Sequence, residues 1–141
     1  MVGFYLRLMK KFLACTMALG AFAFSGCGEK EDGKASYALV TTGVASFWDI
    51  CKKGGEDAGK ELGVDVEVLM PTSGDDQKSK LEDLLAKGVD GIAVAAIDPI
   101  NQAGLFDEVA KNSILITMDT DAPTTKRQVY VGMDNYDAGW M

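Results

Sequence analysis

From Tyr37 onward, short apolar runs rich in β-forming residues alternate with longer segments in which apolar residues recur at helical spacing. Continuous apolar runs of this kind are typical of strands that are covered on both faces. They predict five strands, at residues 37–42, 64–70, 91–95, 114–117 and 128–131. The segments between them predict helices at residues 46–62, from Asp75 or Asp76 to 87, at 100–111, and from about 135.

An apolar stripe at helical spacing runs along the first predicted helix, and we expect it to face the core. Gly63 and Gly88 end the first two helices, since glycine readily adopts the left-handed conformation found just after a helix. Because a helix lies in each crossover, the chain should form an α/β domain with an open parallel sheet of about five strands and helices on both faces. The stripe consists of Phe47, Ile50, Cys51, Ala58 and Leu62.

The first 26 residues have the pattern of an export signal followed by a lipid-attachment cysteine. Their only charges are basic, an apolar run spans residues 12–24, and Ser25 and Gly26 precede Cys27. We expect a signal helix at 1–26, lipidation at Cys27 with membrane attachment outside the cytoplasm, and a flexible tether at 27–36. The folded domain is then 37–141. A plain signal peptide or an N-terminal membrane anchor is the alternative.

Charge and composition exclude several classes of function. The chain carries a formal net charge of −7, and no acidic residue precedes Glu29, so the exported part is more acidic still. Such a domain would be repelled by nucleic acid. The absence of histidine excludes Ser-His-Asp catalysis and histidine-based zinc sites. No glycine-rich phosphate-binding motif follows a strand, so we expect no cofactor and no enzymatic activity.

Polar residues gather where the predicted strands end. In an open parallel sheet, ligands bind beyond the carboxyl ends of the strands. Three of these ends carry carboxylates, and the aromatic pair Phe47 and Trp48 follows the first strand. Carboxylates that accept hydrogen bonds from hydroxyl groups, beside aromatic faces that cover a ring, suit a neutral polyol. The acidic residues are Asp98, Asp119, Asp121 and Asp134.

Motifs along nearly all of the predicted domain resemble the N-terminal lobe of a bacterial sugar-type periplasmic binding protein. The resemblance implies the type I fold with strand order 2-1-3-4-5, and a substrate-binding component of an ABC importer that captures a monosaccharide between two lobes. It implies a permease and an ATPase as partners, and we expect a monomer. The motifs are LVTTGVASFW (39–48), GVDGIAV (88–94), DPIN (98–101), ITMDTDAP (116–123) and VGMDNYDAG (131–139).

The resemblance also implies roles for single residues. Phe47 and Trp48 match an aromatic pair that packs on the sugar, and Asp119 matches a carboxylate that accepts from its hydroxyls. Asp121 matches the second acid of an Asp-Xaa-Asp variant found in some members, including those that bind cyclised polyol signals. Asp98 and Asp134 are further candidates. Pentose-binding members tend to have asparagine and arginine where this chain has Ala45 and Thr120, which argues against ribose-like specificity.

Ordinary structural roles compete with these assignments. Ser46, Asp98 and Asp134 each have the form of a helix N-cap. Phe47 continues the apolar stripe, so it is expected to be the core residue of the aromatic pair. Asp119 follows a strand directly, and no structural partner for it is evident.

Three other functions remain open. A magnesium site of Asp98, Asp119 and Asp121 would serve phosphoryl transfer. A binding protein that presents its ligand to a receptor or sensor kinase would have the same sequence features. A sugar-responsive repressor would share the fold, although the exported, acidic character of this chain opposes it. Because the family continues beyond the position of Met141, we expect this chain to be a fragment that binds sugar weakly or not at all.

Overall fold

The computed structural model describes residues 33–140. The signal segment 1–26, the lipidation site Cys27 and most of the tether lie outside the described residues. Strands and helices alternate along this part of the chain, except that a loop without a helix, residues 119–128, joins the fourth strand to the fifth. Our expectation of a helix in each crossover is wrong for this connection. In order, the elements are β1 (Ser36–Val40), α2 (Ser46–Leu62), β2 (Asp65–Leu69), α3 (Gly74–Lys87), β3 (Gly91–Val94), α4 (Ala103–Asn112), β4 (Ile114–Met118), β5 (Val129–Val131) and α5 (Asn135–Trp140).

The five strands form one parallel sheet in the order β2-β1-β3-β4-β5, which confirms the predicted fold. Val40 pairs with Leu69 and Val94, and Val94 pairs with Thr117. All strands therefore end at the same edge of the sheet. We call the residues that follow the strands at this edge the carboxyl rim.

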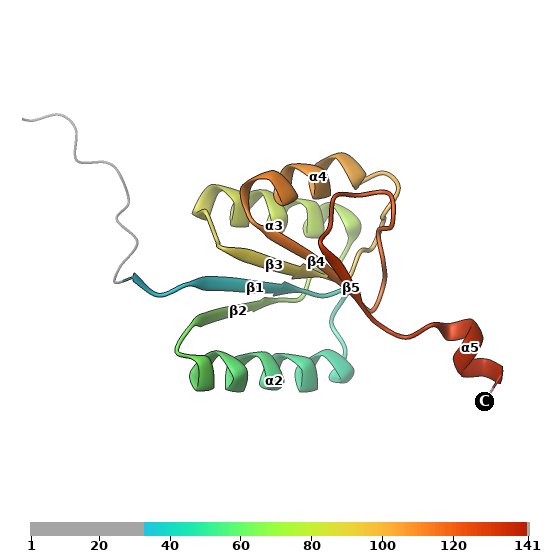
Figure 1. The fold of residues 1–141 in the computed structure, drawn as a ribbon, viewed down its shortest axis with the longest axis horizontal. Helices are drawn as coiled ribbons and strands as arrows, with labels where there is room; N and C mark the ends of the chain where they lie inside the picture. The colour runs from blue at the N-terminus through green and yellow to red at the C-terminus, as the bar shows by residue number, and fades with distance from the viewer. Residues whose placement is uncertain (1–32, 141) are drawn as a thin grey trace, which may run out of the picture. The chain divides into compact units, whose positions relative to one another are not determined.

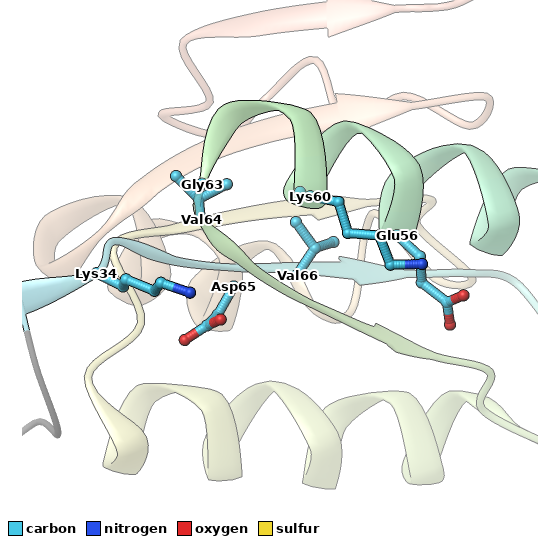
Figure 2. Close-up of a pocket in the computed structure, with 8 residues that line it drawn as sticks. Lys34, Glu56, Lys60, Gly63, Val64, Asp65 and Val66 are labelled. Carbon is cyan, nitrogen blue, oxygen red and sulfur yellow. The ribbon is translucent and has the colours of Figure 1, made fainter.

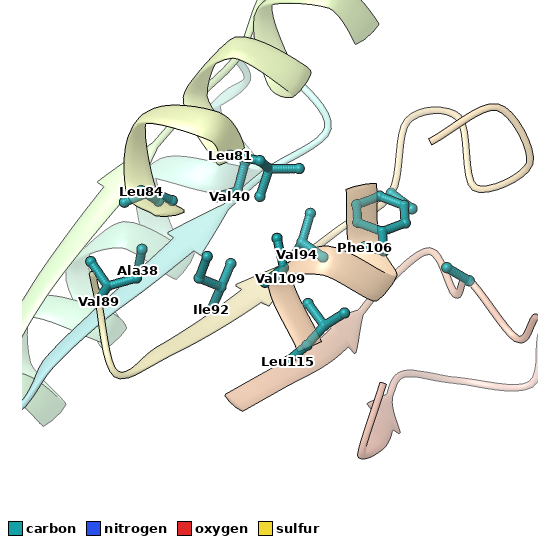
Figure 3. Close-up of a cluster of buried hydrophobic side chains, with 12 residues drawn as sticks. Ala38, Val40, Leu81, Leu84, Val89, Ile92, Val94, Phe106, Val109 and Leu115 are labelled. Carbon is teal, nitrogen blue, oxygen red and sulfur yellow. The ribbon is translucent and has the colours of Figure 1, made fainter. Parts of the chain in front are cut away.

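Helices cover the two faces of the sheet unequally. Figure 1 shows α3 and α4 side by side on one face and α2 alone on the other, while α5 stands clear of the sheet. The main core lies beneath α3 and α4, where alternate residues of β1, β3 and β4 meet the helices (Figure 3). Phe106, Leu81 and Leu84 are its largest fully buried side chains.

The face by which α2 contacts the sheet differs from the predicted stripe. Trp48 and Gly59 are buried, whereas Phe47, Ile50 and Leu62 are between 63% and 76% exposed. A Cβ at Gly59 would lie 2.8 Å from a Val66 methyl group, so α2 approaches β2 closely because this position has no side chain. The prediction was wrong because a search for apolar periodicity overlooks a contact made by glycine.

The predicted stripe lies on a flank of α2. Its members Ala58 and Leu62 line an apolar hollow of about 530 Å³ together with Tyr37, Val64 and Val66. A second apolar hollow of about 260 Å³ lies over β1, β3 and β4, between residues such as Leu39 and Ile116. The strand face on the side of α2 is thus less covered than the face beneath α3 and α4.

The helix starts also differ from prediction. The N-cap of α2 is Ala45 and not Ser46, and it makes no side-chain cap bond. Ser73 caps α3 by accepting a hydrogen bond from the Asp76 N–H, so neither Asp75 nor Asp76 is the cap. The fourth helix, α4, begins at Ala103 and not at residue 100. The residues predicted as its first turn form a separate turn, which is closed by a hydrogen bond to Asp98. Among residues 33–140, no helix has the length and apolar character needed to cross a membrane.

Candidate ligand-binding site

The carboxyl rim brings together residues that are far apart in sequence. The loop after β1 leads to Phe47 and Trp48 at the start of α2, and Asp119 directly follows β4. Only β3 separates β1 from β4, so these two strands lie about 10 Å apart. Asp98 follows β3 and Asp134 follows β5, which places both on the same rim.

The aromatic pair has one exposed and one buried member. Phe47 is 63% exposed, Trp48 is 6% exposed, and their rings meet edge to face with centroids 4.9 Å apart. Our expectation that Phe47 is the core residue is therefore wrong. Successive helical residues point about 100° apart, and Trp48 shares its side of α2 with Gly59, which faces the sheet. The Phe47 ring is therefore exposed to solvent and contacts the buried Trp48 ring.

Asp119 presents a carboxylate on the surface of the rim. It is the only non-glycine residue between 33 and 140 with a positive φ, at 60°. The Thr120 hydroxyl, 3.5 Å from Oδ2, is the nearest hydrogen-bonding group recorded for its side chain within that range. The carboxylate is thus available to accept hydrogen bonds from a ligand.

Asp121 is held inside the loop that joins β4 to β5. Its Oδ1 accepts from the Thr117 hydroxyl at 2.6 Å and the Ala122 N–H at 2.7 Å. Arg127 binds both oxygens, with Nε 2.5 Å from Oδ1 and Nη2 2.7 Å from Oδ2. The hydrogen bond from Arg127 is the main cause that lowers the pKa of Asp121 from 3.8 to about 2. Both carboxylate oxygens of Asp121 are thus engaged by groups of the protein itself.

A pH titration of stability should reveal this pair. Because the folded pKa is lowered to about 2, the stability that ionised Asp121 contributes is complete above pH 4 and is lost as the pH falls toward 2. The shift corresponds to at most about 2 kcal/mol. We expect the difference in free energy of unfolding between the wild type and Asp121→Asn to shrink by up to that amount from pH 5 to pH 2, in urea titrations. A difference independent of pH would contradict the assignment.

Asp98 and Asp134 accept hydrogen bonds within their own turns. The Asn101 backbone N–H donates to Asp98 at 3.0 Å and the Asn101 side chain donates at 2.7 Å, and the backbone bond is the larger cause that lowers the pKa of Asp98. Asp134 accepts from the backbone of Tyr136 at 2.9 Å, at the start of α5. Asp134 therefore has the predicted capping role. The N-cap of α4 is Gln102, so the predicted helix-capping role of Asp98 is wrong, and its carboxylate instead closes the turn before α4.

The proposed magnesium ligands have separate partners. Asp98 is bound to Asn101, Asp121 is bound to Arg127, and Asp119 projects from its own turn. In the part of the chain that the structure describes, no three acidic or cysteine side chains converge as a metal site would require. The rim therefore offers single carboxylates to a ligand.

Gln77 organises the rim, although it was not among the predicted site residues. This fully buried side chain donates to the carbonyls of Thr41 at 2.9 Å and Ala95 at 2.8 Å, and accepts from the Ile97 N–H at 3.0 Å. It thereby joins the loops that follow β1 and β3. Its spacing with Leu81 and Leu84 on one face of α3 was the available signal, because a polar residue in a buried stripe needs partners.

A polar hollow of about 410 Å³ lies away from this site, beside the starts of β1 and β2 (Figure 2). Lys34 precedes β1, and Gly63 and Val64 precede β2, so the hollow lies at the amino ends of these strands. Its charged residues are of both signs, including Lys60 and Glu56. The aromatic and carboxylate groups of the carboxyl rim therefore form a surface separate from it.

Comparisons with known proteins agree on one family. A family model described as a periplasmic binding protein domain matches residues 37–141. The D-allose-binding periplasmic protein of Escherichia coli (strain K12) is 41% identical over 71 residues, which are 48% of this chain and 23% of that protein.

Solved structures show the same likeness. An ABC transporter solute-binding protein from Burkholderia graminis, in complex with D-arabinose, has a TM-score of 0.72 and 29% identity, with 79% of this chain and 39% of that chain covered. GanP, a glucose-galactose binding protein from Geobacillus stearothermophilus, has a TM-score of 0.70 and 36% identity, with 77% and 40% covered. The chain thus spans about two fifths of the length of these structures.

Proposed function

Since the chain belongs to the periplasmic binding protein domain family, we propose that it forms one lobe of an exported sugar receptor. In this proposal the complete protein is the substrate-binding component of an ABC importer. It captures a monosaccharide or similar polyol, and closure of a second lobe over the ligand favours the form that the transporter recognises.

The arrangement of the carboxyl rim is the observation that carries the proposal. The exposed carboxylate of Asp119 directly follows β4, and the exposed ring of Phe47 lies at the start of the helix that follows β1, two strands away in the sheet. A sugar ring has hydroxyl groups that donate to a carboxylate and an apolar side that covers an aromatic ring. The carboxyl rim therefore presents both kinds of group that a monosaccharide needs.

We assign the ligand contacts accordingly. Asp119 accepts hydrogen bonds from the sugar, and Phe47 packs on its ring while Trp48 supports Phe47 from behind. Asp98 and Asp134 border the site, with carboxylates already engaged in their own turns. The partners in this proposal are an ABC permease and ATPase, and a lipid at Cys27 holds the protein on the outer side of a membrane. Affinity capture of the intact exported protein from membranes would distinguish these partners from a receptor or sensor kinase.

Weak but site-specific sugar binding tests the function. We expect D-allose, D-arabinose, D-glucose or D-galactose to shift the backbone amide resonances of residues 47–48 and 119–121 in the purified chain. The dissociation constant should be on the order of 1 mM, because one lobe contacts the ligand from one side only. Asp119→Asn should reduce the shifts at least about fivefold, because it replaces an acceptor that carries a charge.

A matched substitution at the opposite edge controls for the change of charge. Asp65→Asn alters an exposed acid beside the polar hollow and should leave the sugar-induced shifts unchanged. If the sugars shift resonances only outside the rim, or if Asp119→Asn leaves the sugar-induced shifts unchanged, the proposed function is wrong.

A further inference from the structure

Asp119 combines a strained backbone with an exposed side chain whose one hydrogen bond among the described residues, from the Thr120 hydroxyl, is 3.5 Å long. The Thr120 N–H donates to the Met118 carbonyl at 2.6 Å, so Asp119 is the central residue of a γ-turn with positive φ. This is a strained type of turn, and side chains with a Cβ disfavour its left-handed conformation. Such a conformation persists only where neighbouring groups hold it.

Tyr130 and β5 hold the turn from one side. The Asp119 N–H donates to the Val131 carbonyl at 3.0 Å, and the Tyr130 hydroxyl donates to the Asp119 carbonyl at 2.8 Å. Tyr130 reaches this position by passing over Gly132, where a Cβ would lie 2.1 Å from the hydroxyl oxygen. Glycine at position 132 therefore makes the contact with Asp119 possible.

The Asp121–Arg127 pair holds the loop from the other side. Asp121 accepts a hydrogen bond from the hydroxyl of Thr117, which lies in β4, and Arg127 lies two residues before β5. The pair thus joins the two ends of the loop between β4 and β5, and it holds in place the residues that follow Asp119. Both partners are shielded, with side chains 22% and 24% exposed, so solvent weakens the pair less than it weakens a surface ion pair.

The Asp119 carboxylate takes no part in this network, whose bonds all end on backbone groups or on Asp121. A functional group is most effective when its support fixes its position and leaves its own atoms available. We propose that Tyr130 and the Asp121–Arg127 pair are positioning residues, which hold the strained turn so that the Asp119 carboxylate projects toward the ligand. This inference rests on the proposed function for its ligand and on the contacts above for its mechanism.

Nuclear magnetic resonance of the purified chain tests the mechanism without a ligand. A strong contact between the amide and α protons of Asp119 reports the positive φ, and amide exchange of Thr120 reports opening of the turn. Tyr130→Phe removes one hydrogen bond and should speed exchange at Thr120 about twofold to tenfold. Tyr136→Phe changes an exposed tyrosine of α5, and should leave that exchange unchanged.

Arginine variants test the second anchor by conservative rescue. Arg127→Met should weaken the positive-φ signal at Asp119, and Arg127→Lys should restore part of it, since lysine keeps the charge and loses the paired geometry. Amide exchange of the buried Leu81 and Phe106 reports whether a variant unfolds as a whole. Opening of the turn with an intact core supports the proposal. Unchanged exchange at Thr120 in Tyr130→Phe, together with retention of the Asp119 signal in Arg127→Met, overturns it.

Sugar titrations then separate the two proposals. If the wild-type chain responds to one of the four sugars, Tyr130→Phe should weaken that response at least twofold and Tyr136→Phe should not. An unchanged response in Tyr130→Phe would overturn the positioning role. If Asp119→Asn leaves the sugar response unchanged, the proposed function fails, and the conformational measurements still decide whether these residues hold the turn.

Discussion

Replacing Gln77 with leucine is expected to lower the free energy of unfolding by about 3 to 5 kcal/mol. Leucine preserves the approximate volume and leaves three backbone groups without their partner, namely the buried carbonyls of Thr41 and Ala95 and the partly buried N–H of Ile97. Each unsatisfied group costs about 1–3 kcal/mol. A domain of this size is stable by about 5–15 kcal/mol, so urea unfolding should detect the loss readily.

Gln102 provides a matched control on the same rim. It is also buried, but it makes a single recorded side-chain bond, from Nε2 to the Gly74 carbonyl at 2.8 Å, and its Oε1 has no partner among the described residues. Gln102→Leu should therefore cost about 1 kcal/mol or less. If the two substitutions cost the same, Gln77 would not be the link between the loops after β1 and β3.

Two glycines on α2 should respond to alanine in opposite directions. Alanine at an exposed helix interior is normally favoured over glycine by about 0.5–1 kcal/mol. A methyl group at Gly54 would have no neighbouring atom within 4 Å, so Gly54→Ala should raise the free energy of unfolding by that amount. At Gly59 a methyl group would lie 2.8 Å from Val66 and 3.1 Å from the Val64 carbonyl, so Gly59→Ala should lower it by about 1–3 kcal/mol.

The steric origin of the Gly59 effect can be checked with a second substitution. Val66→Ala removes the methyl group that lies nearest to the new side chain, and it should cost less in the Gly59→Ala background than in the wild type. Purely additive effects in thermal or urea unfolding would mean that α2 does not rest on β2 through this glycine.

The strands and their order followed from the sequence because a helix lies in each of the first three crossovers and because the motifs indicated one family. The orientation of α2 did not follow. Apolar periodicity selected the stripe that includes Phe47 and Leu62, whereas the helix contacts the sheet through Trp48 and Gly59. Hydrophobicity reports which positions avoid water, but close approach of a helix to a strand depends on which positions have no side chain.

The candidate site, like the fold, was predictable from the sequence only in part. Parallel strands alone place Asp119 and the start of α2 on one edge, so the sequence was sufficient to gather these residues. It could not show that Arg127 binds Asp121, or that Gln77 reaches two loops. These contacts join residues through the geometry of loops and through side-chain rotamers, for which a single sequence has no periodic signal.

The left-handed backbone of Asp119 bears on any attempt to engineer this domain for heat resistance. Glycine adopts that conformation without steric cost, so selection for thermal stability would favour Asp119→Gly, which removes the carboxylate. Under the proposed function, stability and ligand recognition thus place opposite demands on residue 119, and a stabilised variant intended as a biosensor scaffold would have to exclude this position from randomisation.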